Sequence, residues 1–232
     1  MSSSAKAAVC PSSDQVYASN GAAFQLRRPP GGEPLHILAI GSSSTEGVGA
    51  SGPTHAYPAR LEARLKADGV IAADVKNAGI GGEIAETTLK RLDAALATRW
   101  PQLVIWQVGT NDALTGVPVG QLSALIQKGI AETRAAGDQI VLIDPQLTLL
   151  PMKSPAYQPY AETVDAAGAE AHTPVIKRYQ SMRRLAEQGA VAPLISGDGL
   201  HMSDFGYDCL AGALAKVIDN AAKVSGSLSA QR

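Results

Sequence analysis

Asp198 and His201 stand three residues apart in a glycine-containing loop that runs from Ser196 to His201. This spacing lets the carboxylate hydrogen-bond one imidazole nitrogen while the other nitrogen faces a serine hydroxyl. A serine hydroxyl is a weak nucleophile without such a base, so the pair is a candidate general base with its orienting carboxylate. Taken alone, an Asp-x-x-His pair is more often a turn carboxylate next to a surface or capping histidine.

Ser43 is the candidate nucleophile. It lies in Gly41-Ser42-Ser43-Ser44, directly after the apolar run 35–40, which is typical of a buried strand. In open α/β sheets, ligands bind at the carboxyl ends of the strands. The sequence therefore predicts that these serine hydroxyls lie at the mouth of a sheet.

Gly82 and Asn111 are candidate donors to an oxyanion, one through a backbone N–H and the other through its side-chain NH₂. They occur in the clusters Asn77-Ala78-Gly79-Ile80-Gly81-Gly82 and Gly109-Thr110-Asn111-Asp112, which follow two further strand-like runs. Removal of one oxyanion donor costs about 10²–10³ in turnover in other enzymes. Taken alone, the first cluster is more often a flexible turn between strand and helix than an oxyanion donor. The second, taken alone, is more often a helix cap or an Asx-turn. The order and placement of the clusters together favour the catalytic interpretation.

The apolar pattern predicts strands that alternate with helices after residue 34. Strands are expected at 35–40, 71–77, 102–108, 139–143 and 173–176. Helices are expected at 56–67, 83–98, 119–136, 159–171 and 177–188, with a last helix capped by Ser203. Such alternation favours an α/β fold with one parallel sheet covered on both faces. We expect an N-terminal arm at 1–34, one domain at 35–224 and a short tail at 225–232.

Composition narrows the class of protein. The 232 residues include 20 basic and 21 acidic side chains, and 45% of residues are hydrophobic, as in globular domains. Neither nucleic acid nor an anionic membrane is expected as a partner, and no apolar run approaches the roughly 18 residues of a membrane span. No cofactor or metal is expected. The pattern Gly47-x-Gly49-x-x-Gly52 begins seven residues after the predicted strand and is followed by Pro53, which argues against dinucleotide binding.

Cys10 and Cys209 are the only cysteines. They are either two unrelated thiols or one disulfide that ties the arm to the last helix, and the second alternative would imply an exported protein. The N-terminus lacks the pattern of a signal peptide. The chain is therefore expected to be cytoplasmic, or periplasmic or secreted if it is a mature form with an added Met.

The four clusters together resemble the SGNH (GDSL-type) hydrolases over about residues 35–220. The resemblance implies a three-layer α/β/α sandwich around a five-stranded parallel sheet of flavodoxin-like type. It also implies that Ser43 is the nucleophile, that His201 is the base and that Asp198 orients it. The oxyanion donors would be the backbone N–H groups of Ser43 and Gly82 and the side chain of Asn111.

The resemblance leaves the substrate open. Family activities include hydrolysis of esters and thioesters, among them lysophospholipids and carbohydrate acetyl esters. We expect short acyl esters of an alcohol or carbohydrate, with a thioesterase or lysophospholipase, or a non-catalytic binding module, as alternatives. The loop 145–158 either borders an acyl pocket or is a surface Ω-loop packed on its own side chains. The oligomeric state stays open.

Ser42 is a departure from the family pattern, in which an Asp usually precedes the nucleophile. That Asp is not part of the triad, so the replacement does not exclude catalysis. A closer likeness is to bacterial members that read Gly-Ser-Ser-Ser-Thr and end in His-Met-x-Asp-x-Gly-Tyr. Several of those look exported, which favours the disulfide.

Overall fold

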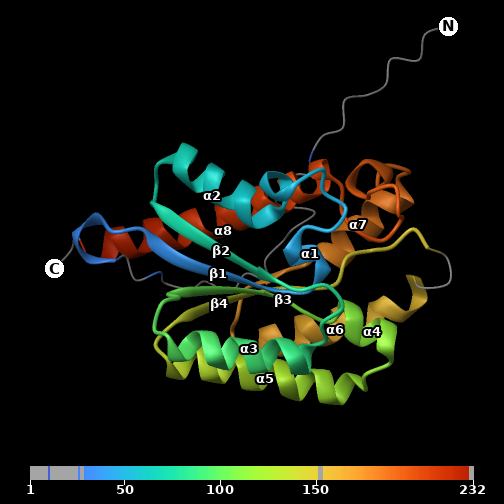
Figure 1. Cartoon of the computed structure of the whole chain (residues 1–232), viewed down its shortest axis with the longest axis horizontal. Coiled ribbons are helices and arrows are strands. Elements are labelled where there is room, and N and C mark those ends of the chain that lie inside the picture. The colour runs from blue at the N-terminus through green and yellow to red at the C-terminus, as the bar shows by residue number, and fades with distance from the viewer. Residues whose placement is uncertain (1–9, 11–25, 27–28, 151–153, 230–232) are drawn as a thin grey trace, which may run out of the picture.

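The computed structural model describes residues 10, 26, 29–150 and 154–229. A five-stranded sheet lies between two layers of helices (Figure 1). All strands are parallel, in the order β2-β1-β3-β4-β5. The strands are β1 (Leu35–Gly41), β2 (Ala73–Gly79), β3 (Leu103–Gln107), β4 (Gln139–Ile143) and β5 (Val175–Ile176). The predicted α/β sandwich with five parallel strands is confirmed.

The helices divide between the two faces of the sheet (Figure 1). One layer contains α2 (Tyr57–Asp68), α7 (Arg178–Glu187) and α8 (Asp204–Ser229). The other contains α3 (Ala85–Ala97), α5 (Val119–Ala135) and α6 (Ser154–Glu170). Short 3₁₀ helices lie at η1 (Pro30–Gly32), η2 (Pro53–His55) and η3 (Ala192–Leu194).

Two hydrophobic cores fill the spaces between the sheet and its helical layers. Successive strand residues point to opposite faces, so Ile37 packs in one core and Leu38 in the other. The helix faces predicted from apolar spacing lie in these cores; Leu61 of α2 and Leu89 of α3 are buried, for example. Burial on both faces explains why the inner strands are apolar throughout.

β2 departs from the prediction in two ways. It extends to Gly79, so Asn77-Ala78-Gly79 belongs to the strand and not to the loop after it. None of its residues is fully buried, because it lies at an edge of the sheet and pairs only with β1.

The sequence predicts one loop at 145–158, but the structure divides this segment into a loop and the start of α6. α6 begins at Ser154, because the proline at 155 falls in the first turn, where no intrahelical N–H bond is needed. Tyr157 lies in this helix and is buried in the core, as is Leu147. Leu149 is 45% exposed, and Met152 lies outside the described residues.

The helix α8 is capped at its start and is bonded to a residue of the N-terminal region. Ser203 caps α8, since its hydroxyl accepts the N–H of Gly206 at 3.1 Å. Leu26 is buried, and a disulfide joins Cys10 to Cys209 in α8. The assignment of residues 1–34 to a separate arm stays a prediction.

The disulfide closes a separation of 199 residues. In the chain-entropy model such a cross-link contributes about 5 kcal/mol to the free energy of unfolding. We expect Cys10→Ser to lower the melting temperature by about 10–20 °C, measured by calorimetry, and reductant to lower that of the wild type equally. Mass spectrometry that found two free thiols in freshly purified native protein would contradict the cross-link.

Candidate active site

The nucleophile segment makes a tight turn at the end of β1. Ser43 is the first residue of the short helix α1 (Ser43–Glu46), which the sequence reading did not predict. α1 lies so close to β2 that a Cβ on Gly79 would come 2.0 Å from the backbone nitrogen of Glu46. A Cβ on Gly41 would come 2.7 Å from the carbonyl oxygen of Gln107. Only glycine at both positions lets the helix turn back over the sheet.

Ser43, His201 and Asp198 form one hydrogen-bonded chain. The Oγ of Ser43 lies 2.9 Å from Nε2 of His201, and Nδ1 of His201 lies 2.6 Å from Oδ2 of Asp198. The other carboxylate oxygen of Asp198 accepts the N–H of Leu200 at 2.8 Å and the hydroxyl of Ser196 at 2.7 Å. The structure thus brings together the three residues that the sequence singled out.

The Asp198 carboxylate is held in its ionised form. Desolvation by burial acts to raise its pKa. The hydrogen bonds from His201 and Ser196 and from the loop N–H groups outweigh burial and hold the pKa well below its ordinary value. Because the pKa of Asp198 is lowered in the folded state, its ionised carboxylate stabilises the fold at pH values above the ordinary carboxyl range. This stabilisation is lost only as the pH falls towards the lowered pKa.

Gly81, the residue before the candidate oxyanion donor Gly82, lies close to Ser43. A Cβ on Gly81 would come 3.9 Å from the Cβ of Ser43, and the N–H of Gly81 donates to Glu46 at 2.8 Å. The next residue, Gly82, has a φ of 81° in the left-handed region that favours glycine. Asn111 lies in α4 (Thr110–Thr115), and one N–H of its amide donates to the carbonyl of Glu83 at 2.8 Å. The amide carries a second N–H, which is the candidate donor to an oxyanion.

An ion pair missed at the sequence level supports this loop. Arg91 of α3 pairs with Glu83 and donates to the carbonyl of Ala78 at 2.9 Å. Asp112 accepts the N–H of Ala85 at 3.0 Å and so caps α3 rather than its own helix. These contacts join positions that are 8 to 27 residues apart, and they were not predicted from the sequence.

Ser42 makes a specific contact in place of the usual Asp. Its N–H and its hydroxyl both donate to Oε1 of Gln107, at 3.0 and 2.9 Å. The Nε2 of Gln107 donates in turn to Thr110 at 3.2 Å. Ser42 therefore connects the nucleophile turn to the segment that contains Asn111.

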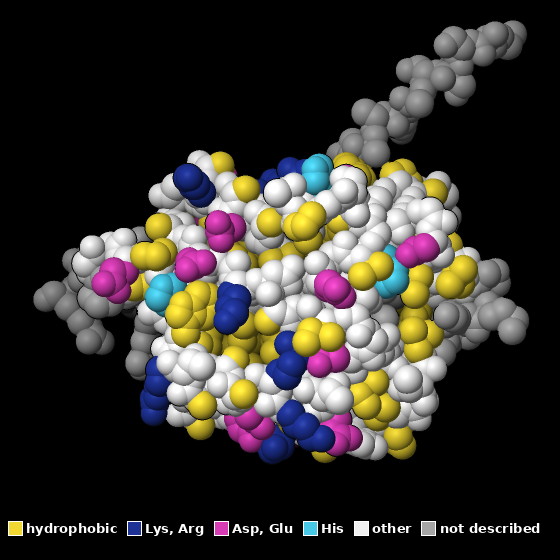
Figure 2. Space-filling view, in the orientation of Figure 1, with side chains coloured by type: hydrophobic (Ala, Val, Ile, Leu, Met, Phe, Trp, Pro, Cys, Tyr) yellow, Lys and Arg dark blue, Asp and Glu magenta, His cyan; other side chains and the backbone are white. Residues whose placement is uncertain are grey.

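Hydrophobic side chains are scattered over the face shown in Figure 2, among polar and charged ones. Four large hydrophobic side chains are exposed among the described residues. They are Val48 after α1, Ile80 after β2, Val119 at the start of α5 and Leu149 between β4 and α6.

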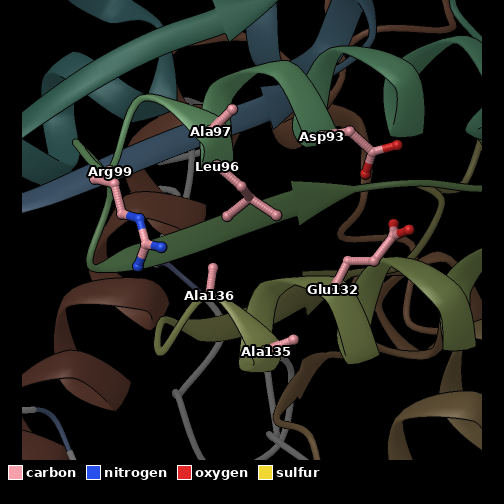
Figure 3. A pocket seen from close by; sticks show the side chains of 7 residues that line it. All are labelled: Asp93, Leu96, Ala97, Arg99, Glu132, Ala135 and Ala136. Atoms are coloured by element: carbon pink, nitrogen blue, oxygen red, sulfur yellow. The ribbon is translucent and has the colours of Figure 1, made fainter.

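A hollow of about 430 Å³ lies elsewhere, between α3 and α5 (Figure 3). Asp93 and Glu132 face each other across it, and Arg99 lies at one end. Desolvation and the neighbouring Asp93 raise the pKa of Glu132. None of its lining residues belongs to the Ser43 site.

Comparison with known proteins agrees with this geometry. The profile of the non-GDSL lipase-like family matches residues 9–224. The chain belongs to this family and is an SGNH hydrolase. Esterase TesA of Pseudomonas aeruginosa is 29% identical over 166 residues, which cover 71% of this chain and 78% of TesA.

Solved structures give the same picture. A crystal structure of TesA matches with a TM-score of 0.68 and 25% identity, over 80% of this chain and 99% of that one. An acetyl-xylooligosaccharide esterase from Geobacillus matches with a TM-score of 0.68 and 20% identity, over 81% and 95% of the two chains, and shows the shared fold. By its family, the chain is a carboxylic ester hydrolase.

Among residues 10, 26, 29–150 and 154–229, no three His, Cys, Asp or Glu side chains are grouped to hold a metal ion. Within the same residues, no helix has the length and apolar character needed to cross a membrane.

Asp198→Asn should lower kcat by about 10³-fold or more, because an amide does not stabilise the imidazolium. The matched control is Asp204→Asn, since Asp204 also accepts a backbone N–H and a hydroxyl but does not touch His201. We expect the control to keep kcat within about twofold. Equal losses in the two variants, measured by steady-state ester hydrolysis, would contradict the role of Asp198.

The rate should fall from neutral towards mildly acidic pH, because a protonated imidazole cannot act as the base of a serine hydrolase. Asp198 stays ionised there, since its pKa is lowered. The pH profile of kcat/KM should therefore show one protonation step. A flat profile between about pH 5 and 8 would count against His201 as the base.

Proposed function

We propose that this protein hydrolyses short-chain carboxylic esters through an acyl-enzyme formed on Ser43. The observation that carries the proposal is the contact between Ser43 Oγ and His201 Nε2 at 2.9 Å, with Asp198 on the far side of the imidazole at 2.6 Å. These two contacts support the proposal, because a histidine base must touch the serine that it deprotonates and a carboxylate on its other nitrogen would favour the tautomer that this needs.

In acylation, His201 takes the hydroxyl proton as Ser43 Oγ bonds to the ester carbonyl carbon. The oxyanion is stabilised by the N–H groups of Ser43 and Gly82 and the amide of Asn111. As the first residue of α1, Ser43 has an N–H that needs no intrahelical acceptor. His201 then gives its proton to the departing alcohol, and the carbonyl re-forms as the acyl-enzyme.

Deacylation repeats the steps with water. His201 removes a proton from a water molecule, whose oxygen attacks the acyl carbon. Collapse of the second tetrahedral intermediate returns the proton to Ser43 and releases the carboxylic acid. One cycle therefore consumes one ester and one water molecule and returns Ser43 and His201 to their starting state.

The preference for acetyl to butyryl groups rests on the exposed apolar positions near the site. Val48 and Ile80 lie just after α1 and β2, and Leu149 is tied to the base loop through its N–H, which donates to the carbonyl of Gly199 at 2.8 Å. We infer that aliphatic side chains at these positions would contact a small acyl group on Ser43. An alcohol or a carbohydrate is the expected leaving group.

Ser43→Ala should lower hydrolysis of p-nitrophenyl acetate by about 10³-fold or more. Ser181→Ala removes a buried hydroxyl from α7 and serves as a control with unchanged turnover. Wild-type protein that turns over no faster than Ser43→Ala would favour the non-catalytic alternative.

A chain-length series should give the highest kcat/KM for acetyl or butyryl esters and a lower value for octanoyl esters. Leu149→Trp should narrow the profile further towards acetyl, because it adds bulk next to Gly199. A maximum with octanoyl esters or acyl thioesters would replace the proposed substrate class by the lysophospholipase or thioesterase alternative.

A further inference from the structure

Gln146 is fully buried in the segment after β4 and contacts four different parts of the chain. Its Oε1 accepts hydrogen bonds from the hydroxyls of Ser44 at 3.3 Å and Thr110 at 3.2 Å, and from Nη2 of Arg178 at 2.8 Å. Its Nε2 donates to the carbonyl of Leu200 at 3.3 Å. The side-chain amide of Gln146 therefore both accepts and donates hydrogen bonds.

Three of these partners adjoin the proposed catalytic residues in the chain. Ser44 follows the nucleophile, Thr110 precedes Asn111, and Leu200 precedes His201. The nucleophile turn, the α4 segment and the base loop are far apart in the sequence. Gln146 touches each of them one residue away from the side chain that would act on the substrate.

Arg178 fixes the position of Gln146 through the hydrogen bond from its Nη2. The Arg178 side chain is fully buried, and its Nε and Nη2 donate to the carbonyl of Asp144 at 3.1 and 2.9 Å. Its Nη1 lies 3.6 Å from Sδ of Met202, the residue after His201. The Asp144 carboxylate accepts the N–H groups of Arg178 and Tyr179 at the start of α7.

Gln107 extends the same network to Ser42. It accepts both donors of Ser42 and donates to Thr110, whose hydroxyl continues to Gln146. The chain of hydrogen bonds thus runs from the residue before the nucleophile to the residue before the base. All its side chains are at most 3% exposed.

We propose that Gln146, held by Arg178, is a positioning residue that sets the relative placement of Ser43, Asn111 and His201. The inference rests on the proposed esterase function. Catalytic groups must lie within about 0.5 Å of their productive geometry, and a misplacement of about 1 Å can cost 10²-fold in rate. A buried amide shared by three loops supplies such a constraint, because each loop would leave an unsatisfied polar group if it shifted.

Gln146→Met keeps the size of the side chain and removes both ends of the amide. We expect kcat for p-nitrophenyl acetate to fall about 10–100-fold while KM changes less than about threefold, because the network does not touch the substrate. Thr133→Val is the matched control, since it removes a fully buried hydroxyl whose partner is Gly129 within α5. The control should keep kcat within about twofold.

Gln146→Glu tests the acceptor and the donor of the amide separately. It keeps an acceptor for Ser44, Thr110 and Arg178 and loses the donor to Leu200. We expect a kcat between those of wild type and Gln146→Met. Amide hydrogen exchange should rise only around 198–202 in this variant, but around 42–46, 110–113 and 198–202 in Gln146→Met.

Three outcomes would overturn the inference. The first is a folded Gln146→Met variant with kcat within about twofold of wild type. The second is a rise in exchange spread evenly over the strands, which indicates general destabilisation. The third is a Gln146→Glu variant as impaired as Gln146→Met, with the same exchange pattern. Ser43→Ala is measured alongside, and wild type no faster than that variant would overturn the proposed function itself.

Discussion

The hydrogen bond between Ser43 and His201 joins residues 158 positions apart, and the arrangement of the site depends on it. Its two partners come from opposite ends of the sequence, after β1 and before α8. The bond forms only if both segments reach the carboxyl end of the parallel sheet. The topology places them there, because parallel strands gather their following loops at one edge.

Bringing those loops together buries polar groups. Gln107, Gln146, Asp144 and Arg178 are all almost completely buried below the site. Buried polar groups are costly unless hydrogen-bonded, and here each has partners from a different segment. Desolvation raises the pKa of Asp144 well above its ordinary range, opposed by the nearby Arg178 and by the N–H groups of α7. The network makes the positions of the loops interdependent.

Elements with a strong local pattern were predictable from the sequence. Apolar runs of four or more residues marked β1, β3 and β4, and helical spacing marked α2, α3 and α5. The edge strand β2 was displaced in the prediction because its polar residues resemble a loop. α6 was predicted to begin too late because its first turns contain prolines, and the one-turn helix α1 is too short for any periodicity.

The candidate site was predictable only in part. Ser43, Asp198 and His201 were identified through short clusters of chemically distinctive residues, and the structure places them in contact. Their catalytic roles stay a proposal. Gln146 and Arg178 were missed because their partners lie in other segments, so neither type nor spacing marks them. Arg91 was missed although its partner Glu83 is only eight residues away, because such a pair within one predicted helix is also typical of a solvated surface. Ser42 was recognised as unusual, but its contact with Gln107 required the register of β1 against β3.

The most direct test is to label the protein with a fluorophosphonate, which reacts with activated serines, and to locate the adduct by peptide mass spectrometry. Three adjacent serines make the result informative. The phosphonyl group is predicted on Ser43 alone, with labelling slowed strongly in His201→Ala. An adduct on Ser42 or Ser44, or labelling that does not depend on His201, would contradict the assignment of Ser43 as the nucleophile.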